Sequence, residues 1–110
     1  MSKLPKPFRQ FQADFPALSQ AYEALGNEAS KSGPLDAKVR ELIKLGMAAA
    51  RRSESAVHSH TFRALDAGAS KAEIEHAIVI GITTLGFPTM MAALTWAREA
   101  IENRERAEED

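Results

Sequence analysis

Four residues of this chain have the spacing of a thiol redox site but lack its thiols. Glu41 is followed by Ser53 and Ala56, which are three residues apart at an expected helix start, and then by His60. A carboxylate and an imidazole there could transfer protons, and a helix N-terminus lowers the pKa of a nearby thiol. However, a hydroxyl and a methyl group form no disulfide, and the whole chain contains no cysteine. The sequence therefore excludes dithiol exchange within this chain and leaves acid–base chemistry by Glu41 and His60.

Each of these side chains also has a structural interpretation. Ser53 stands at an expected helix start, and serine is a preferred N-cap. His60 falls on the apolar stripe of its helix, where a histidine can be a hydrogen-bonded core residue. Glu41 could be an exposed charge near Lys38 or Lys44. Alternatively, it could orient the His60 imidazole across two packed helices.

A pair of arginines next to Ser53 suggests binding of an acid. Arg51 and Arg52 lie at an expected helix junction. A guanidinium matches a carboxylate through two hydrogen bonds, so Arg52 could hold a substrate carboxylate. The same side chains could instead satisfy the terminal carbonyls of the preceding helix.

The three histidines predict no metal site. His58 and His60 form an H-x-H pair, but side chains two residues apart on a helix diverge by about 200°. Glu54 lies one turn from His58, and His76 is a further candidate ligand. These residues make no closed set of ligands, so we expect neither a metal nor another cofactor.

Hydrophobic periodicity and capping residues predict an all-α chain, with no alternating run long enough for a sheet. Helices are expected from Pro16 to Gly33, from Asp36 to Arg52, from Ser53 to Gly68, from Ser70 to Gly86, and from Phe87 to Ile101. The clearest start is the capping box of Ser70 and Glu73. The sequence therefore predicts a bundle of five to six helices.

The size of the chain predicts a single domain over residues 1–110, because two domains would each be too small for a core. Pro5, Pro7 and scattered charge suggest an irregular, flexible arm at 1–12. The polar residues 103–110 suggest a solvated, fraying tail.

Composition excludes several classes of partner. The 14 basic and 15 acidic residues nearly balance, which argues against binding to nucleic acid or to an anionic membrane surface. No apolar run reaches the length of a signal peptide or a membrane span, so we expect a cytoplasmic protein.

The segment from Ile78 to Ala97 is apolar on nearly every side, which is unusual for so short a chain. We expect these residues, with Met90, Met91 and Trp96, to pack in a core or between subunits of a homo-oligomer. A compact monomer with a generous core is the alternative.

From about Leu35 to Ile101 the chain resembles the carboxymuconolactone decarboxylase and alkylhydroperoxidase D-like superfamily. The resemblance rests on several motifs in matching order and spacing: the Arg-Glu-Leu opening at 40–42, the His-Thr-x-x-Ala-Leu-x-Ala-Gly run at 60–68, the S-x-x-E start at 70–73, and the Gly-x-Pro break at 86–88. The resemblance implies an all-helical fold that assembles as trimers or hexamers.

The peroxidase branch of that family has a glutamate, a C-x-x-C pair and a histidine, whose positions fall on Glu41, Ser53, Ala56 and His60. Loss of both sulfurs argues against alkylhydroperoxidase activity. The decarboxylase branch acts on a lactone acid in aromatic-compound breakdown. It does without the cysteine pair and keeps a histidine at the position of His60, which makes it the better analogue.

The residues and the resemblance together lead to a specific hypothesis. The chain would be a cofactor-independent lyase, a decarboxylase or isomerase of a small organic acid or lactone. His60 would be the general acid or base, Glu41 would orient it, and Ser53 and Arg52 would bind substrate between the second and third helices. Two alternatives remain open: a non-catalytic relative that binds a small molecule or serves in an assembly, and a peroxidase that borrows its thiol from another protein.

Overall fold

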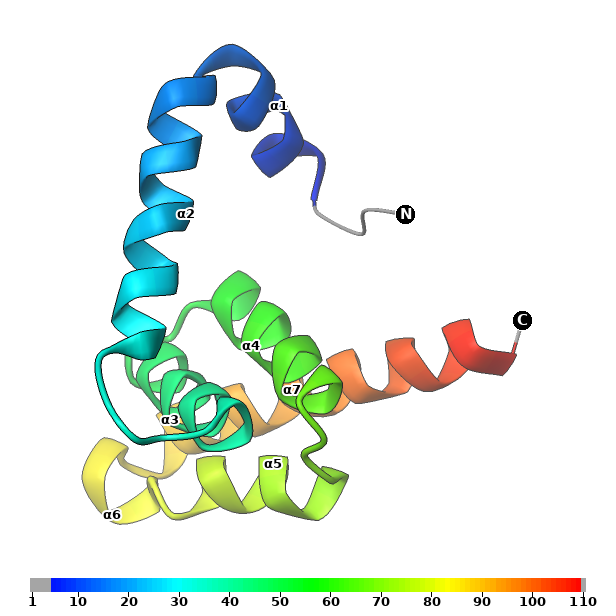
Figure 1. Cartoon of the computed structure of the whole chain (residues 1–110). Coiled ribbons are helices and arrows are strands. Elements are labelled where there is room, and N and C mark those ends of the chain that lie inside the picture. Colours follow the sequence, from blue (N-terminus) through cyan, green and yellow to red (C-terminus); the bar gives the residue numbers. More distant parts are fainter. Residues whose placement is uncertain (1–4, 110) are drawn as a thin grey trace. The chain divides into compact units, whose positions relative to one another are not determined.

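The computed structural model describes residues 5–109, which contain helices and no strand. The helices are α1 (Lys6–Asp14), α2 (Pro16–Lys31), α3 (Ala37–Ala50), α4 (Glu54–Asp66), α5 (Lys71–Val79), α6 (Ile82–Leu85) and α7 (Phe87–Glu109) (Figure 1). The all-α prediction is confirmed. Contacts divide the chain into two compact units, residues 1–34 and 35–110, and the single domain over residues 1–110 stays a prediction.

The first unit begins with a helix that the sequence did not predict. Residues 6–12 of the expected irregular arm belong to α1, so that prediction was wrong for them; residues 1–4 lie outside the described part. Pro7 falls in the first turn, where its missing N–H is no loss because no carbonyl precedes it in the helix. The rings of Phe8, Phe11 and Phe15 follow one another at centroid distances of 6.4 and 5.8 Å, which stabilises the α1–α2 corner.

The second helix begins at Pro16, as predicted, and carries an unburied apolar stripe. Leu18, Tyr22 and Leu25 lie at helical spacing and are 58, 65 and 66% exposed. An amphipathic helix normally buries such a stripe against a neighbouring element. Within the described residues, the first unit therefore presents an exposed apolar stripe.

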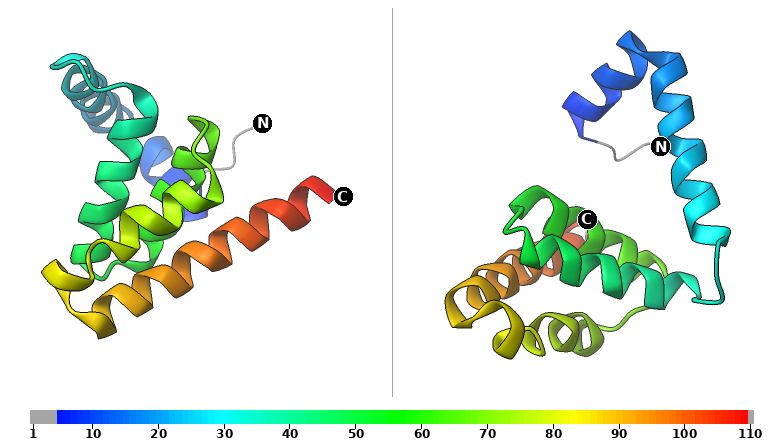
Figure 2. Two further views of the ribbon diagram at one scale, coloured as in Figure 1. Left: turned by 90° about the horizontal axis from the view of Figure 1, so that it is seen from below. Right: turned by 90° about the vertical axis from the view of Figure 1, so that its left-hand side faces the viewer.

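The second unit holds the main core. Helix α3 packs against α4 and α5, and both α4 and α5 pack against α7, the long helix whose C-terminal end extends past the others (Figure 2). The core consists of Leu45, Ala48, Ala49, Val57, Ala64, Ala69, Ile74, Ile78, Met90, Ala93, Leu94, Ala97 and Ile101. Met91 and Trp96 pack against it, so the predicted packing role of the methionines and tryptophan is confirmed.

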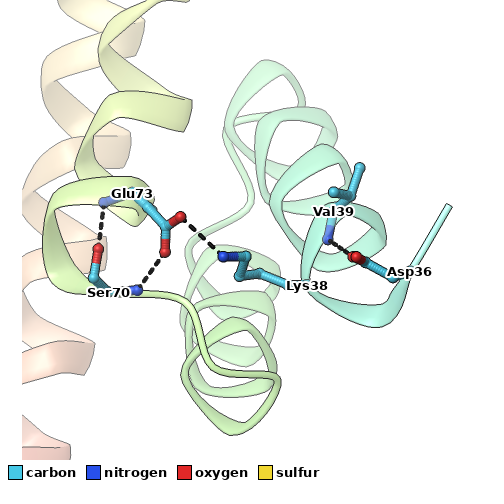
Figure 3. Close-up of polar contacts among 5 residues, drawn as sticks. All are labelled: Asp36, Lys38, Val39, Ser70 and Glu73. Carbon is cyan, nitrogen blue, oxygen red and sulfur yellow. Dashed lines mark hydrogen bonds and ion pairs between the residues drawn. The ribbon is translucent and has the colours of Figure 1, made fainter.

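Side-chain caps set the starts of α3, α4 and α5, as the sequence predicted. Asp36 accepts a hydrogen bond from the backbone N–H of Val39 at 3.0 Å (Figure 3). Ser70 accepts from the N–H of Glu73 at 3.0 Å, while the Glu73 carboxylate accepts from the N–H of Ser70 at 2.9 Å. Glu73 also accepts from Lys38 of α3 at 3.0 Å, so the capping box joins two helices.

The fourth predicted helix is interrupted before its expected end. The sequence predicted one helix from Ser70 to Gly86, but α5 ends at Val79 and a separate turn, α6, follows. A Cβ at Gly81 would lie 3.0 Å from the carbonyl oxygen of Ile78 and 3.1 Å from the Leu85 side chain. Glycine therefore permits a tight break that hydrophobic periodicity does not reveal.

The polar tail is helical where the sequence predicted a fraying end. Helix α7 continues to Glu109, and only Asp110 lies outside the described residues. The Arg104 guanidinium donates to Asp66 at 2.8 Å and lies 5.2 Å from the centroid of the Phe62 ring. These contacts with α4, together with good helix formers in the tail, explain why the tail is helical.

The capping box generates a pH-dependent stability prediction. The Ser70 backbone N–H, and then Lys38, hold the pKa of the Glu73 carboxyl below its ordinary value. The folded chain therefore binds the Glu73 carboxyl proton more weakly than the unfolded chain does. As a result, the carboxylate stabilises the fold at pH values above the unfolded pKa of about 4.3. This stabilisation is lost as the pH falls through the folded pKa.

We expect Glu73→Gln to have a lower melting temperature than the unmodified chain at pH 7, with the difference shrinking as pH falls to about 3. Thermal unfolding followed by circular dichroism measures this difference. Glu23→Gln, which removes an exposed carboxylate with no ion pair among the described residues, is the control. A difference in melting temperature between Glu73→Gln and the unmodified chain that stays constant with pH would contradict the lowered pKa of Glu73.

Candidate functional site

A tight turn returns α4 along α3 and brings distant residues together. Helix α3 ends in a Schellman motif, in which Arg52 N–H donates to Ala49 at 3.0 Å and Ser53 N–H donates to Ala48 at 3.3 Å. Arg52 takes a φ of 52°, and no other non-glycine residue of the described chain has a positive φ. This turn packs α3 and α4 side by side.

The turn places Glu41 of α3 against His60 of α4. His60 Nδ1 and Glu41 Oε1 are 3.0 Å apart, although 19 residues separate them in sequence. Their side chains are 20 and 18% exposed, so the pair is partly shielded but open to solvent. Glu41 is therefore not an isolated surface charge beside Lys38, whose ammonium instead pairs with Glu73.

The contact determines which nitrogen of the imidazole is available. A carboxylate accepts hydrogen bonds, so Nδ1–H of His60 donates to Glu41. In the neutral ring, Nε2 then carries the free lone pair, and no hydrogen bond among residues 5–109 occupies it. The arrangement can accept a proton at Nε2 and can stabilise the resulting imidazolium through Glu41.

Buried neighbours on α4 hold the imidazole in place. Val57 and Thr61 are fully buried, and Ala56, one turn before His60, packs against the core. The Oγ1 of Thr61 is buried and has no hydrogen-bond partner among the described residues. These side chains fix the rotation of α4 and leave His60 at the edge of the core, facing α3.

Ser53 and Arg52 lie at the N-terminal end of α4, about two turns before His60. The Ser53 hydroxyl accepts from the Ala56 N–H at 3.3 Å, which confirms its capping role. Seven residues along a helix correspond to about 10 Å, so Ser53 does not contact His60 directly. Arg52 donates to the Thr89 hydroxyl at 3.1 Å. No hydrogen bond or ion pair of residues 5–109 joins either residue to the Glu41–His60 pair.

The other two histidines lie elsewhere. His58 Nε2 is 3.3 Å from Glu99 Oε1 of α7, so the two histidines of the H-x-H pair face different helices, as their spacing predicted. His76 lines a groove between α3 and α5. Glu99 was not among the residues selected from the sequence, because 41 residues separate it from His58 and no local motif links them.

Two adjoining grooves lie beside α5, away from the Glu41–His60 pair. The first, of about 460 Å³, is lined by Val39, Leu42, Ile43, Gly46, Glu73, His76, Ala77 and Ile80. The second, of about 390 Å³, continues along α3 toward Leu85. The sequence placed the pocket between the second and third predicted helices, which are α3 and α4. Neither groove is that pocket, because neither is lined by Glu41 or His60.

Comparison with known proteins relates this arrangement to one family. A sequence model of the carboxymuconolactone decarboxylase family matches residues 16–99, which cross both compact units. An uncharacterised protein of Haemophilus influenzae is 42% identical over 59 residues, which are 54% of this chain. The matched part spans about half of that protein's length (52%).

Two solved structures share the fold. A carboxymuconolactone decarboxylase family protein from Legionella pneumophila superposes with a TM-score of 0.78 at 27% identity, over 88% of this chain and 86% of its own. A proposed carboxymuconolactone decarboxylase from Burkholderia xenovorans LB400 superposes with a TM-score of 0.72 at 27% identity. The superposition covers 97% of this chain and 85% of that protein. Among residues 5–109, none of the helices combines the length and the hydropathy of a membrane span.

Proposed function

Because this chain belongs to the carboxymuconolactone decarboxylase family, we propose that it is a cofactor-independent decarboxylase or isomerase of a small organic acid or lactone. The observation that carries the proposal is the 3.0 Å contact between His60 Nδ1 and Glu41 Oε1, which leaves Nε2 free. A partly exposed imidazole oriented by a carboxylate is suited to general acid–base catalysis near neutral pH.

In decarboxylation, the bond between the carboxyl carbon and its neighbour breaks, and the electron pair remains on that neighbour while carbon dioxide leaves. Protonated His60 then delivers its Nε2 proton to this carbon. In isomerisation, neutral Nε2 removes a proton from carbon and returns it at another position. In both reactions the Glu41 carboxylate stabilises the imidazolium form and fixes the ring.

Ser53 and Arg52 are proposed to bind the acid group of the substrate. The Arg52 guanidinium gives one of its five N–H groups to Thr89, and the others could pair with a carboxylate. The Ser53 hydroxyl accepts from Ala56 and still has a hydrogen to donate. Because these groups stand about 10 Å along α4 from His60, the substrate must separate its acid group from its reacting carbon by several bonds.

Non-catalytic binding is the alternative that a specific observation favours. Neither of the two grooves includes Glu41 or His60, so the pair could act only as a contact that holds α3 to α4. A peroxidase is disfavoured, because the chain has no sulfur nucleophile. Such an enzyme would have to take its thiol from another protein.

A pair of substitutions tests catalysis. We expect His60→Gln to lower kcat/KM for a lactone acid by about 100-fold or more, because the proton donor is lost. Glu41→Gln should give a smaller loss, because the amide oxygen still accepts a hydrogen bond. Steady-state assays with melting temperatures measure both effects. His76→Gln, on α5, is the matched control.

The enzyme proposal predicts that both variants keep the melting temperature within a few degrees of the unmodified chain. Lower melting temperatures with unchanged turnover would show that the pair is structural. Absence of turnover in the unmodified chain, together with saturable binding of the acid that survives in His60→Gln, would favour the non-catalytic alternative.

We also propose that the chain forms a homo-oligomer, a trimer or hexamer, through the α3–α5 face. Large apolar side chains are exposed on or near this face: Val39, Ile43, Met47, Ile80 and Phe87. Met47 and Ile80 are each 61% exposed. At Gly46, in the middle of this face, an added Cβ would meet no atom within 4 Å. A glycine inside a helix is destabilising, and here it leaves room for a neighbouring backbone to approach.

We expect Ile43→Asp and Met47→Asp to reduce the oligomer to smaller species at micromolar concentration, because a charge buried at an interface is costly. Size-exclusion chromatography with light scattering gives the mass. Gln20→Asp, at an exposed position of α2, should leave it unchanged. A monomeric unmodified chain, or an oligomer that resists both substitutions, would contradict this surface.

A further inference from the structure

A group of side chains that could bind a metal ion lies on the side of α4 that faces α7. Glu54, His58 and Glu99 each offer one ligand atom, and these three atoms all lie within 4.8 Å of one another. Glu54 and His58 are one turn apart on α4, and Glu99 comes from the neighbouring α7. The cluster shares no residue with the Glu41–His60 pair.

The distance between two of the ligand atoms fits a shared metal ion as well as it fits a long hydrogen bond. His58 Nε2 and Glu99 Oε1 are 3.3 Å apart, whereas N–H···O bonds cluster near 2.9–3.0 Å. In a tetrahedral zinc site with bonds of about 2.0–2.1 Å, two ligand atoms are separated by about 3.3–3.4 Å. A zinc ion could therefore bind both atoms without a change in the distance between them. The Glu54 ligand oxygen lies within 4.8 Å of both atoms.

The charges of the cluster also favour a cation. Two other acids near these helices have a guanidinium partner: Arg98 pairs with Glu75, and Arg104 pairs with Asp66. In the described chain, Glu54 and Glu99 make no ion pair with lysine or arginine, and the basic group that pairs with Glu99 is the His58 imidazole. Two carboxylates thus converge on one imidazole, and a divalent ion would offset their repulsion.

We propose that Glu54, His58 and Glu99 form a binding site for a divalent transition-metal ion of the zinc class. His58 Nε2 and one oxygen from each carboxylate are the protein ligands, and water completes the coordination. One imidazole with two carboxylates matches the nitrogen and oxygen ligands of zinc, whereas magnesium and calcium take oxygen ligands. The His58 and Glu99 side chains are 29 and 51% exposed, so an ion can reach them from solvent.

Such an ion would join α4 to α7. Helix α4 also carries His60, and the ion would restrain the helix that positions this imidazole. This inference does not rest on the proposed catalytic function, because binding and thermal stability are measured without substrate. The expectation that the chain binds no metal came from His58, His60, Glu54 and His76, and it did not include Glu99, which lies on another helix.

The test uses the full chain without an affinity tag, because a histidine tag would itself bind metal. Zinc is titrated in by calorimetry, and cobalt is titrated in while its visible absorption is recorded. We expect one ion per chain and a higher melting temperature with zinc. Glu99→Gln, which preserves size, and His58→Ala should each weaken binding by about 100-fold or more and remove the thermal shift.

Two substitutions serve as matched controls. Glu102→Gln removes an exposed carboxylate three residues further along α7, and His76→Ala removes a histidine outside the cluster. Both should bind zinc as the unmodified chain does. Because Glu99→Gln keeps its shape, its circular dichroism should be unchanged, which separates loss of a ligand from loss of folding.

Two outcomes would overturn the proposal. One is the absence of saturable zinc or cobalt binding at micromolar concentration. The other is binding that persists in Glu99→Gln and His58→Ala but disappears in His60→Ala or His76→Ala, which would place the ion elsewhere.

Discussion

The packing of α4 against α3 is the constraint on which the site depends. A helix that ends in a Schellman motif reverses the chain within a few residues, and here Arg52 occupies the position where glycine is usual. A non-glycine residue at positive φ has a conformational cost, which the packing of two helices over a shared core offsets. Glu41 and His60 are 19 residues apart in sequence, and without this reversal their side chains would not meet.

The features that the sequence predicted well are those set by neighbouring residues. Asp36, Ser53 and Ser70 each cap a helix through a backbone N–H three residues ahead, so their identity and position are sufficient. Likewise, Gly68 and Gly86 have φ angles of 96° and 89° and mark helix ends. Such local rules also placed Glu41 and His60 on facing helices, although the sequence alone left open whether they meet.

The features that the sequence missed depend on tertiary contacts or backbone details. Helix α1 has no side-chain cap at its start, so the sequence gives no polar signal where this helix begins. The break at Gly81 depends on the approach of Leu85, and the helical tail is held by Arg104 against α4. Glu99 joins His58 only through packing of α4 and α7, so no local spacing could have indicated it.

The Glu41–His60 pair acts in the proposed catalysis only if Nδ1–H of His60 donates to the carboxylate, so that Nε2 is bare in the neutral ring and carries the mobile proton in the charged one. Nitrogen-15 NMR of the imidazole measures this directly, because the protonated and bare ring nitrogens of a neutral histidine have different chemical shifts. The account predicts that neutral His60 carries its proton on Nδ1 and that Glu41→Gln changes the shifts of this ring more than those of His76. A His60 ring protonated on Nε2, or one insensitive to Glu41→Gln, would contradict it.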